Sequence, residues 1–344
     1  MNIVITGGAG FLGARLARAL LKQGQFSVNG SASRSIERLT LVDQFAPPAD
    51  LTADPRVKAC VGDLNALLTP GPQGVPAVPK GTDVVYHLAA AVSGECEADF
   101  DLGMRSNLAA TQALLAACRA LDTQPVVVFA SSLAVFGWPA EAPAPTGPWV
   151  VTDQTLPTPQ TSYGIQKLIG EQLMADYTRK GFIRGRSARL MTVSVSPGKP
   201  NGAASSFFSG MVREPLAGVK GACPVAREVD VALSSPGRTI DGLLRVGQCS
   251  DGEWGPRTAL NMPALVTTVG EMAQALERVA GPEAAALIDW TPNDDIRRIV
   301  RSWPGRVESA RANALGLLPD PDFESVIRDY VRENPQAVKW AIRD

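Results

Sequence analysis

The first thirteen residues constrain the fold of this chain more than any other stretch. Residues 3–5 are apolar and β-branched, as in a strand that is buried on both faces of a parallel sheet. Gly7, Gly10 and Gly13 follow at three-residue spacing and lead into an apolar helix. Such glycines permit a tight turn, a close approach of the backbone to a pyrophosphate and close packing of the helix on the strand. A glycine triplet can also mark a flexible loop, but its position between strand and helix predicts a dinucleotide site, with the phosphates at the helix N-terminus.

Strands and helices alternate along the chain, which is typical of an α/β fold. We predict further strands at 39–43, 57–61, 83–91, 125–132 and 189–195, and helices at 14–21, 107–121, 162–177, 266–279, 308–316 and 322–333. The pattern predicts a Rossmann-type doubly wound parallel sheet with a smaller C-terminal substrate-binding subdomain. We expect a dinucleotide-binding domain over 1–196 and a substrate-binding subdomain over 197–344, with some segments returning to the Rossmann core.

An acidic residue ends the second predicted strand. In the dinucleotide fingerprint, a carboxylate at this place accepts hydrogen bonds from the adenosine ribose and repels a 2′-phosphate. Asp43 therefore predicts NAD rather than NADP as the cofactor. Two alternatives stay open: Asp43 is a solvent-facing loop carboxylate, or Arg34 and Arg38 in the polar segment 25–38 accept a phosphate.

The overall charge is close to zero, because 33 Lys and Arg residues are matched by 34 Asp and Glu residues. No bulk field therefore attracts nucleic acid or an anionic membrane, and an acidic substrate must be held by local groups. The five cysteines are widely spaced, without a CxxC pair or a metal-binding pattern. We expect reduced thiols, no bound metal and, without a leader or a membrane-spanning run, a cytoplasmic location.

Candidate catalytic side chains follow the glycine turn in a strand and in a helix. Ser131 and Ser132 end a predicted strand, at the edge where doubly wound sheets bind ligands. Tyr163 and Lys167 are four residues apart, so they share one face of a predicted helix. A surface Tyr–Lys pair is the ordinary interpretation of that spacing alone, but the preceding motifs favour a reactive pair.

The chain has one histidine, His87, which excludes any mechanism that needs two. Because it lies on an apolar strand, we interpret it as a hydrogen-bonded structural residue rather than a base. Ala89 and the two alanines after it leave room for a flat cofactor against the backbone.

Taken in order, these motifs resemble the extended branch of the short-chain dehydrogenase/reductase superfamily, which includes nucleotide-sugar epimerases and dehydratases. The resemblance covers about the first 195 residues and is carried by Thr6 to Gly13, Gly62-Asp63-Leu64, His87 to Ala90, Asn107, Ser131-Ser132 and Tyr163-x-x-x-Lys167. It implies that Tyr163 is the general base, that Lys167 lowers its pKa and holds the nicotinamide ribose, and that Ser132 orients the substrate hydroxyl. It also implies a water-linked proton path at Asn107.

The resemblance further assigns the cofactor contacts and an oligomeric state. The expected NAD contacts are Gly7, Gly10, Phe11, Leu12, Gly13, Asp43, Asp63, Leu64, Ala89, Tyr163, Lys167 and Pro197. Relatives dimerise through the helices that correspond to 107–121 and 162–177, which implies a homodimer.

The second half of the chain is similar to a group within this branch that oxidises C2 of a four-carbon sugar acid with NAD. Residues 197–209, 213–216, 234–238, 261–265 and 302–304 carry that similarity. The chain departs from the group at Ser196, where an arginine is expected before Pro197. The expected contacts to a small acidic substrate are Ser93, Ser132, Tyr163, Lys199, Asn201, Arg213 and Arg238. We prefer Arg238 as the carboxylate clamp, because the planar guanidinium can hold both oxygens.

Two alternatives use the same fold. A nucleotide-sugar epimerase or dehydratase would also need Tyr163 and Lys167, but dehydration in relatives needs acidic residues where Leu133 and Ala134 follow Ser132. A non-catalytic nicotinamide-sensing protein would be expected to lose Tyr163 or Lys167, and both are present. The sequence therefore favours an NAD-dependent dehydrogenase.

Overall fold

The computed structural model describes all residues except 72–74, 122, 140–141, 143–148, 199–201 and 344. Contacts divide the chain into two compact units. The first unit comprises Met1–Ser132, Ile165–Arg189 and Ile240–Leu260, and the second comprises Leu133–Gly164, Leu190–Thr239 and Asn261–Asp344. This division differs from a single boundary after residue 196. Residues 133–164 and 190–196 cluster with the second unit, and residues 240–260 return to the first.

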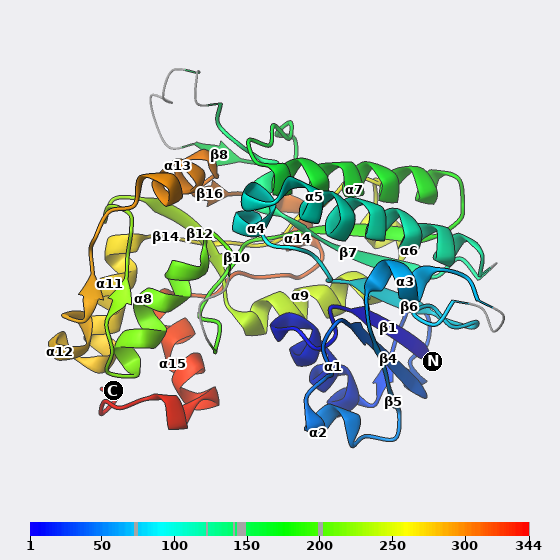
Figure 1. Cartoon of the computed structure of the whole chain (residues 1–344), viewed down its shortest axis with the longest axis horizontal. Coiled ribbons are helices and arrows are strands. Elements are labelled where there is room, and N and C mark those ends of the chain that lie inside the picture. The colour runs from blue at the N-terminus through cyan, green and yellow to red at the C-terminus, as the bar shows by residue number, and fades with distance from the viewer. Residues whose placement is uncertain (72–74, 122, 140–141, 143–148, 199–201, 344) are drawn as a thin grey trace. The chain divides into compact units, whose positions relative to one another are not determined.

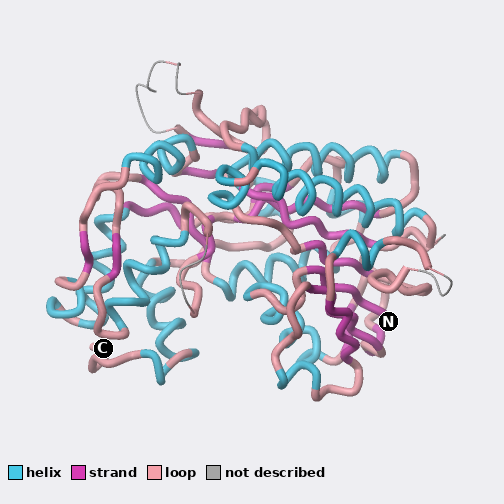
Figure 2. The backbone as a smooth tube through the Cα atoms, viewed as in Figure 1, coloured by secondary structure: helices cyan, strands magenta, loops and turns pink. Residues whose placement is uncertain are grey.

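The first unit contains most of a seven-stranded sheet with the order β13-β9-β7-β6-β1-β4-β5 (Figures 1 and 2). Its strands are β1 (Asn2–Thr6), β4 (Arg38–Asp43), β5 (Val57–Val61), β6 (Val84–His87), β7 (Val126–Ser132), β9 (Arg184–Leu190) and β13 (Leu260–Asn261). β1 pairs in parallel with β4 and β6, β4 with β5, and β6 with β7. The chain starts at β1 and winds outward in both directions, which confirms the predicted Rossmann-type doubly wound sheet.

Helices and one hairpin connect these strands. They are α1 (Phe11–Gln23), β2 (Gln25–Phe26), β3 (Arg34–Ser35), α2 (Ala49–Thr52), α3 (Leu64–Leu68), α4 (Ser93–Ala98), α5 (Phe100–Gly103), the π-helix η1 (Met104–Ala109), α6 (Ala110–Arg119), α7 (Ser162–Arg179), α9 (Pro236–Gln248) and α10 (Asp251–Trp254). Val4, Val85 and Val127 of the sheet pack with Leu114 and Leu115 of α6 in the core. This packing holds the central strands in place. The candidate site residues lie at the carboxyl ends of these strands and in the segments that follow them.

The predicted strand at 189–195 is wrong in position. β9 ends at Leu190, and only the two-residue β10 (Thr192–Val193) follows it. The apolar pattern was misleading because β9 carries two arginines, Arg186 and Arg189, whose exposed fractions are 1% and 7%. Buried charges need partners. Arg186 donates to the Val246 carbonyl oxygen at 2.6 Å, and Arg189 pairs with Glu171.

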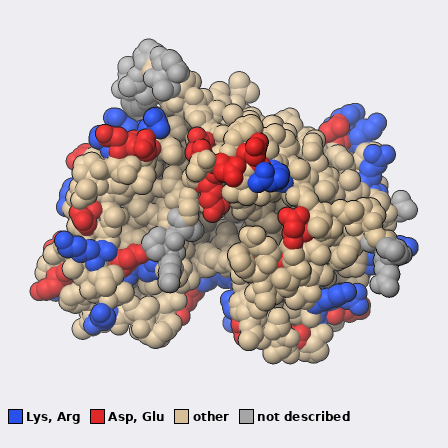
Figure 3. Space-filling view, viewed as in Figure 1, with Lys and Arg blue, Asp and Glu red and all other residues tan. Residues whose placement is uncertain are grey.

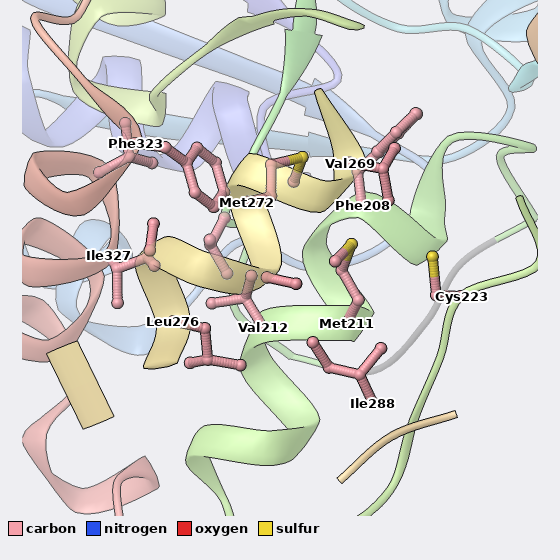
Figure 4. Packing of buried hydrophobic residues seen from close by; sticks show 14 of the residues in the cluster. Phe208, Met211, Val212, Cys223, Val269, Met272, Leu276, Ile288, Phe323 and Ile327 are labelled. Atoms are coloured by element: carbon pink, nitrogen blue, oxygen red, sulfur yellow. The ribbon is translucent and has the colours of Figure 1, made fainter. Parts of the chain in front are cut away.

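The second unit consists of short strands and helices. They are the 3₁₀ turn η2 (Leu133–Val135), β8 (Val150–Val151), β10, α8 (Ser206–Leu216), β11 (Gly221–Ala222), β12 (Asp230–Ser234), β14 (Leu265–Thr268), α11 (Val269–Ala280), α12 (Pro282–Ala285), β15 (Ile288–Asp289), α13 (Asp294–Ser302), β16 (Arg306–Val307), α14 (Ala310–Ala314), α15 (Phe323–Glu333) and η3 (Pro335–Ala337). One sheet has the order β10-β12-β14. Figure 4 shows the core of this unit, where Met211 and Val212 of α8 pack with Met272 and Leu276 of α11 and with Phe323 of α15.

The predicted helix at 266–279 begins later than expected. Residues 265–268 form β14, which runs antiparallel to β12, and α11 begins at Val269. The Thr268 hydroxyl accepts a hydrogen bond from the Glu271 N–H at 3.1 Å, and the Glu271 carboxylate accepts from the Thr268 N–H at 2.8 Å. This reciprocal capping box ends the strand and starts the helix. Thr268 is thus the N-cap of α11.

Charge on the face shown in Figure 3 is of both signs. Acidic side chains gather over α4 and α5, which carry the exposed Glu95, Glu97 and Asp101. Among the described residues, no group of His, Cys, Asp and Glu could hold a metal ion. No described helix is long and apolar enough to cross a membrane, and all five cysteines are buried and free.

Candidate active site and cofactor turn

The turn after β1 requires glycine at two positions. Gly7 has a φ of +73°, and a Cβ at this residue would lie 2.8 Å from the Ala89 nitrogen. A Cβ on Gly13 would lie 2.0 Å from the Gly7 carbonyl oxygen. Both distances are shorter than van der Waals contact, so a side chain would displace the turn or the helix. The Gly7 N–H donates to the Val42 carbonyl oxygen at 2.8 Å, which holds the turn against β4.

The start of α1 fits a pyrophosphate. α1 has 13 residues, and its N-cap is Gly10, which offers no side-chain acceptor to the N–H groups of the first turn. Those N–H groups and the positive end of the helix dipole are therefore available to an anion. Phe11 and Leu12 form the half-buried first turn. The glycine turn and the available N–H groups at the start of α1 thus fit the dinucleotide predicted from the sequence.

Asp43 lies directly against this turn. Its Oδ2 accepts a hydrogen bond from the Ala9 N–H at 3.0 Å, and its Oδ1 accepts from the Phe45 N–H at 3.1 Å. The carboxylate is half-buried at the carboxyl end of β4, beside the glycines. This is the place that the dinucleotide fingerprint gives to the ribose-binding acid.

The two arginines that were considered as alternative phosphate ligands lie at the amino ends of the strands, opposite the carboxyl ends where Asp43 lies. Arg38 begins β4 and pairs with Asn2, the first residue of β1. Arg34 forms an ion pair of 2.6 Å with Asp83, which directly precedes β6. Arg38 and Asp43 are five residues apart along β4, which corresponds to about 17 Å at the rise of a strand. Neither arginine is therefore placed to bind a phosphate beside Asp43.

The remaining predicted cofactor residues of the first unit follow β5 and β6. Asp63 is the N-cap of α3, and its Oδ1 accepts from the Ala66 N–H at 3.0 Å. Leu64 and Ala89 are half-buried, and Ala89 contacts the Gly7 position as described above. Their carboxyl-end placement brings them to the same edge of the sheet as Asp43. Pro197 belongs to the second unit and is exposed.

Lys167 is anchored inside the first unit. It exposes 3% of its surface, and its Nζ donates to the Ala130 carbonyl oxygen at 2.8 Å. The ammonium also lies 4.8 Å from the centre of the Phe129 ring. Burial lowers the pKa of Lys167 to about 8, while Cys96 and Glu171 act in the opposite direction. The lysine thus bonds to the backbone of β7 two residues before Ser132.

Tyr163 and Ser132 occupy the ends of their elements. Tyr163 is half-buried, lies one turn before Lys167 on α7 and clusters with the second unit. Ser132 is the half-buried last residue of β7. Ser93 begins α4 and is 6% exposed. Tyr163 and Lys167 therefore share a helical face, as their spacing predicted.

Asn107 lies in η1, where the helix predicted at 107–121 widens into a π turn before α6. Such turns are frequent at functional sites. Its Oδ1 accepts from the Ala91 N–H at 2.8 Å, and its Nδ2 donates to Gln166 Oε1 at 2.8 Å. Asn107 thereby connects the segment after β6 to the residue that precedes Lys167. Gln166 is a site residue that was not predicted, although its place between Tyr163 and Lys167 was a usable signal.

The surroundings of His87 confirm that it is a hydrogen-bonded structural residue. It is 2% exposed, and its ring nitrogens lie 2.7 Å from Thr6 Oγ1 and 2.9 Å from Thr111 Oγ1. Thr111 donates its own hydrogen to the Asn107 carbonyl oxygen at 2.6 Å, so His87 Nε2 must be the donor to Thr111. Burial, with a smaller contribution from Lys167, lowers the pKa of His87 to about 3. A neutral, fully hydrogen-bonded histidine is therefore expected throughout the working pH range.

The predicted substrate residues of the second unit differ in their surroundings. Arg213 is 6% exposed; its Nη1 donates to the Ser196 carbonyl oxygen at 2.8 Å and its Nη2 to Glu214 at 2.6 Å. Arg238 is exposed in the first turn of α9, where its N–H donates to Ser235 Oγ at 3.1 Å. Within the described part of the chain, its guanidinium has no hydrogen-bond or ion-pair partner. Lys199 and Asn201 lie outside the described residues.

The doubly wound sheet, the glycine turn and the carboxylate of Asp43 beside that turn are the features of an NAD-binding α/β enzyme. Residues 3–229 match the NAD dependent epimerase/dehydratase family. The chain belongs to that family, and NAD is its cofactor. Together with the two dehydrogenases described next, this match confirms the resemblance to the extended short-chain dehydrogenases and the prediction of an NAD-dependent dehydrogenase.

Similar proteins cover nearly the whole chain. It is 47% identical over 335 residues to the D-erythronate dehydrogenase of Cupriavidus necator, with 97% of this chain and 98% of that protein covered. It is 38% identical over 332 residues to the D-erythronate dehydrogenase of Haemophilus influenzae, with 96% and 99% covered. The crystal structure of the nucleoside-diphosphate-sugar epimerase from Agrobacterium tumefaciens superposes with a TM-score of 0.85 at 40% identity, with 98% and 95% covered.

Proposed function

We propose that this chain oxidises the C2 hydroxyl of a D-erythronate-like aldonate to the 2-keto acid and reduces NAD. The observation that carries this proposal is the similarity to two D-erythronate dehydrogenases over nearly their full length. The Tyr163–Lys167 pair supports it, because oxidation of a secondary alcohol needs a base for the hydroxyl proton. NAD supplies the hydride acceptor when it is bound.

Tyr163 is the proposed general base. The ordinary pKa of a tyrosine is near 10, and lowering it by about three units requires about 4 kcal/mol of favourable interaction. The Lys167 ammonium, buried and held by the Ala130 carbonyl, can supply charge from one turn away. In this proposal Ser132 orients the substrate hydroxyl, and Asn107 holds the helix turn from which a water-linked proton path leads away.

Arg238 is the proposed clamp for the substrate carboxylate. Its guanidinium is exposed and free of partners among the described residues, whereas Arg213 is buried and already donates to Ser196 and Glu214. We therefore assign Arg213 to supporting the backbone before Pro197. A bidentate arginine–carboxylate pair would dominate the positioning of a small polyol acid, which has little apolar surface.

A nucleotide-sugar epimerase is the second candidate, because the 40% identical structure from Agrobacterium tumefaciens carries that name. The two functions differ in the fate of the cofactor. A dehydrogenase releases one NADH per substrate oxidised, whereas an epimerase retains its cofactor and accumulates none. An assay at the NADH absorbance band separates the two functions. Its substrates are C4 to C6 aldonic acids and nucleotide sugars, each tested with NAD and with NADP.

The test of the mechanism is Tyr163→Phe. This variant should lose turnover by at least a thousandfold and should bind NADH as the wild type does, because only the acid–base hydroxyl is removed. Activity close to that of the wild type would assign the proton to another group. We also propose a homodimer; exposed Ile165 and Ile169 on α7 support an interface there, and sedimentation measures it.

A further inference from the structure

A buried carboxylate lies one helical turn after Lys167. Glu171 is 4% exposed and forms a bidentate ion pair with Arg189, which is 7% exposed. Arg189 Nε donates to Glu171 Oε1 at 2.8 Å, and Arg189 Nη2 donates to Oε2 at 2.7 Å. Ser131 Oγ donates to the same Oε1 at 2.5 Å. Three charge-assisted hydrogen bonds therefore hold this carboxylate in one position.

These contacts join three elements of the first unit. Glu171 belongs to α7, Ser131 to β7 and Arg189 to β9. Lys167 also bonds to β7, through the carbonyl oxygen of Ala130. Two successive turns of α7 are thus attached to two successive residues of β7, directly before Ser132. Rotation or sliding of α7 would break both attachments.

Stability alone is a weak reason for this arrangement. Apolar residues of similar volume commonly hold a helix on a sheet as well as a buried ion pair does, because desolvation offsets most of the Coulomb energy. Position is more informative. Tyr163, Lys167 and Glu171 follow one another at four-residue spacing, so all three lie along one face of α7. Burial lowers the pKa of Lys167, and Cys96 of α4 and the Glu171 carboxylate both oppose that effect.

We propose that Glu171, held by Arg189 and Ser131, is a positioning residue that fixes the rotation of α7 and keeps Lys167 protonated where the enzyme turns over. This inference rests on the proposed role of Tyr163 as general base. Glu171 acts through Lys167 and does not itself contact the substrate or the cofactor.

The expected effect is a shift of the pH profile of kcat/KM. Glu171→Gln leaves the Arg189 charge uncompensated, so the electrostatic potential rises at both Tyr163 and Lys167. Because the two groups titrate as a coupled pair, both limbs of the profile should move to lower pH. Glu171 is eight residues, about 12 Å, from Tyr163 along the helix axis. A full charge at that distance corresponds to about one pH unit at an effective dielectric constant of about 20.

Two further variants separate charge from general damage. Glu171→Gln combined with Arg189→Gln removes both charges, so the shift should shrink to about half a unit or less. Asp176→Asn is the matched control, because Asp176 lies on the same helix in an ion pair with Arg179 whose side chains are both 58% exposed. Solvent screens that pair, so its removal should leave both limbs in place. Unfolding curves and NADH titrations confirm that each variant is folded.

The outcomes are decisive in each case. A profile that stays within about 0.2 pH unit in Glu171→Gln overturns the proposal, as does an equal or larger shift in the double variant. If Glu171→Gln does not fold, Arg189→Gln is the test: it leaves the Glu171 charge uncompensated, and limbs that do not move to higher pH overturn the proposal. Tyr163→Phe is measured in parallel. If it stays active, the proposed base is wrong; if it is inactive while the Glu171 variants show no shift, only this inference fails.

Discussion

Replacement of Asp43 by asparagine tests the geometry of the cofactor turn. The carboxylate accepts hydrogen bonds from the Ala9 and Phe45 N–H groups through different oxygens. Asp43→Asn keeps one of these acceptors and removes the negative charge. We expect the variant to bind NADPH more tightly than the wild type does and NADH more weakly.

The magnitude follows from charge and distance. Two unit charges 4 Å apart near a protein surface interact by about 4 kcal/mol. Asp43 is half-buried and salt screens part of this energy, so we take about 2 kcal/mol as the repulsion that a 2′-phosphate loses. That corresponds to about a 30-fold gain for NADPH. Exchange of a charged for a neutral acceptor at the ribose costs about 1 kcal/mol, or about fivefold for NADH.

Fluorescence titration with NADH and NADPH measures both dissociation constants without knowledge of the substrate. Asp50→Asn is the control, because Asp50 lies on α2 in an ion pair with Arg18 whose side chains are 56% and 49% exposed. It should leave both constants unchanged. If the NADH-to-NADPH ratio of Asp43→Asn equals that of the wild type, the carboxylate does not face the ribose and the argument from the turn is refuted.

Three further outcomes are expected. Gly13→Ala should abolish NADH binding and lower the free energy of unfolding by about 3 kcal/mol, because its Cβ would lie 2.0 Å from the Gly7 oxygen. Gly10→Ala, whose Cβ would lie 3.2 Å from the same oxygen, should lower the free energy of unfolding much less. His87 takes up a proton below about pH 6.5 in the unfolded chain but only near pH 3 in the folded chain. As the pH is lowered from about 6.5 to about 3, the free energy of unfolding should therefore fall by up to about 1.4 kcal/mol per pH unit. His87→Gln should lose that part of the slope in urea titrations, and an unchanged slope would contradict the buried neutral histidine. Arg238→Ala should raise the KM for an aldonate about a hundredfold with the NADH dissociation constant unchanged, and an unchanged KM removes Arg238 from the site.

The sequence predicted the central fold well because its signals there are local. An apolar strand, a glycine turn and an apolar helix follow one another without interruption, and the structure has β1, the turn and α1 in that order. Gly7 and Gly13 were identified from spacing, and their backbone contacts confirm the reason. The C-terminal helix predicted at 322–333 was found at Phe323–Glu333 for a similar reason, with Asp322 as a local cap.

The sequence failed where burial depends on partners that are far away in the chain. β9 contains Arg186 and Arg189, which hydropathy places on the surface. In the structure their charges are met by the carbonyl oxygens of a helix 60 residues away and by a carboxylate on α7. No periodic pattern encodes such pairing. The helices α8, α9 and α13 were also not predicted, because Pro215 lies inside the first and charged residues dominate the last.

The first unit buries several polar side chains directly below the edge of the sheet at which we propose that NAD binds. His87 is satisfied by two threonines, Asn107 by the Ala91 backbone and by Gln166, and Lys167 by a carbonyl oxygen. Each of these hydrogen bonds constrains the groups that it joins, although the buried Nε2 of Gln166 has no hydrogen-bond partner among the described residues. Each hydrogen bond has a preferred length and direction, whereas apolar contacts tolerate sliding and rotation. A site that must hold Lys167 one turn from Tyr163, the base that we propose, gains more from this directional packing than from additional hydrophobic area. We therefore expect substitutions within the network to alter the pH dependence and kcat of the enzyme before they alter its fold.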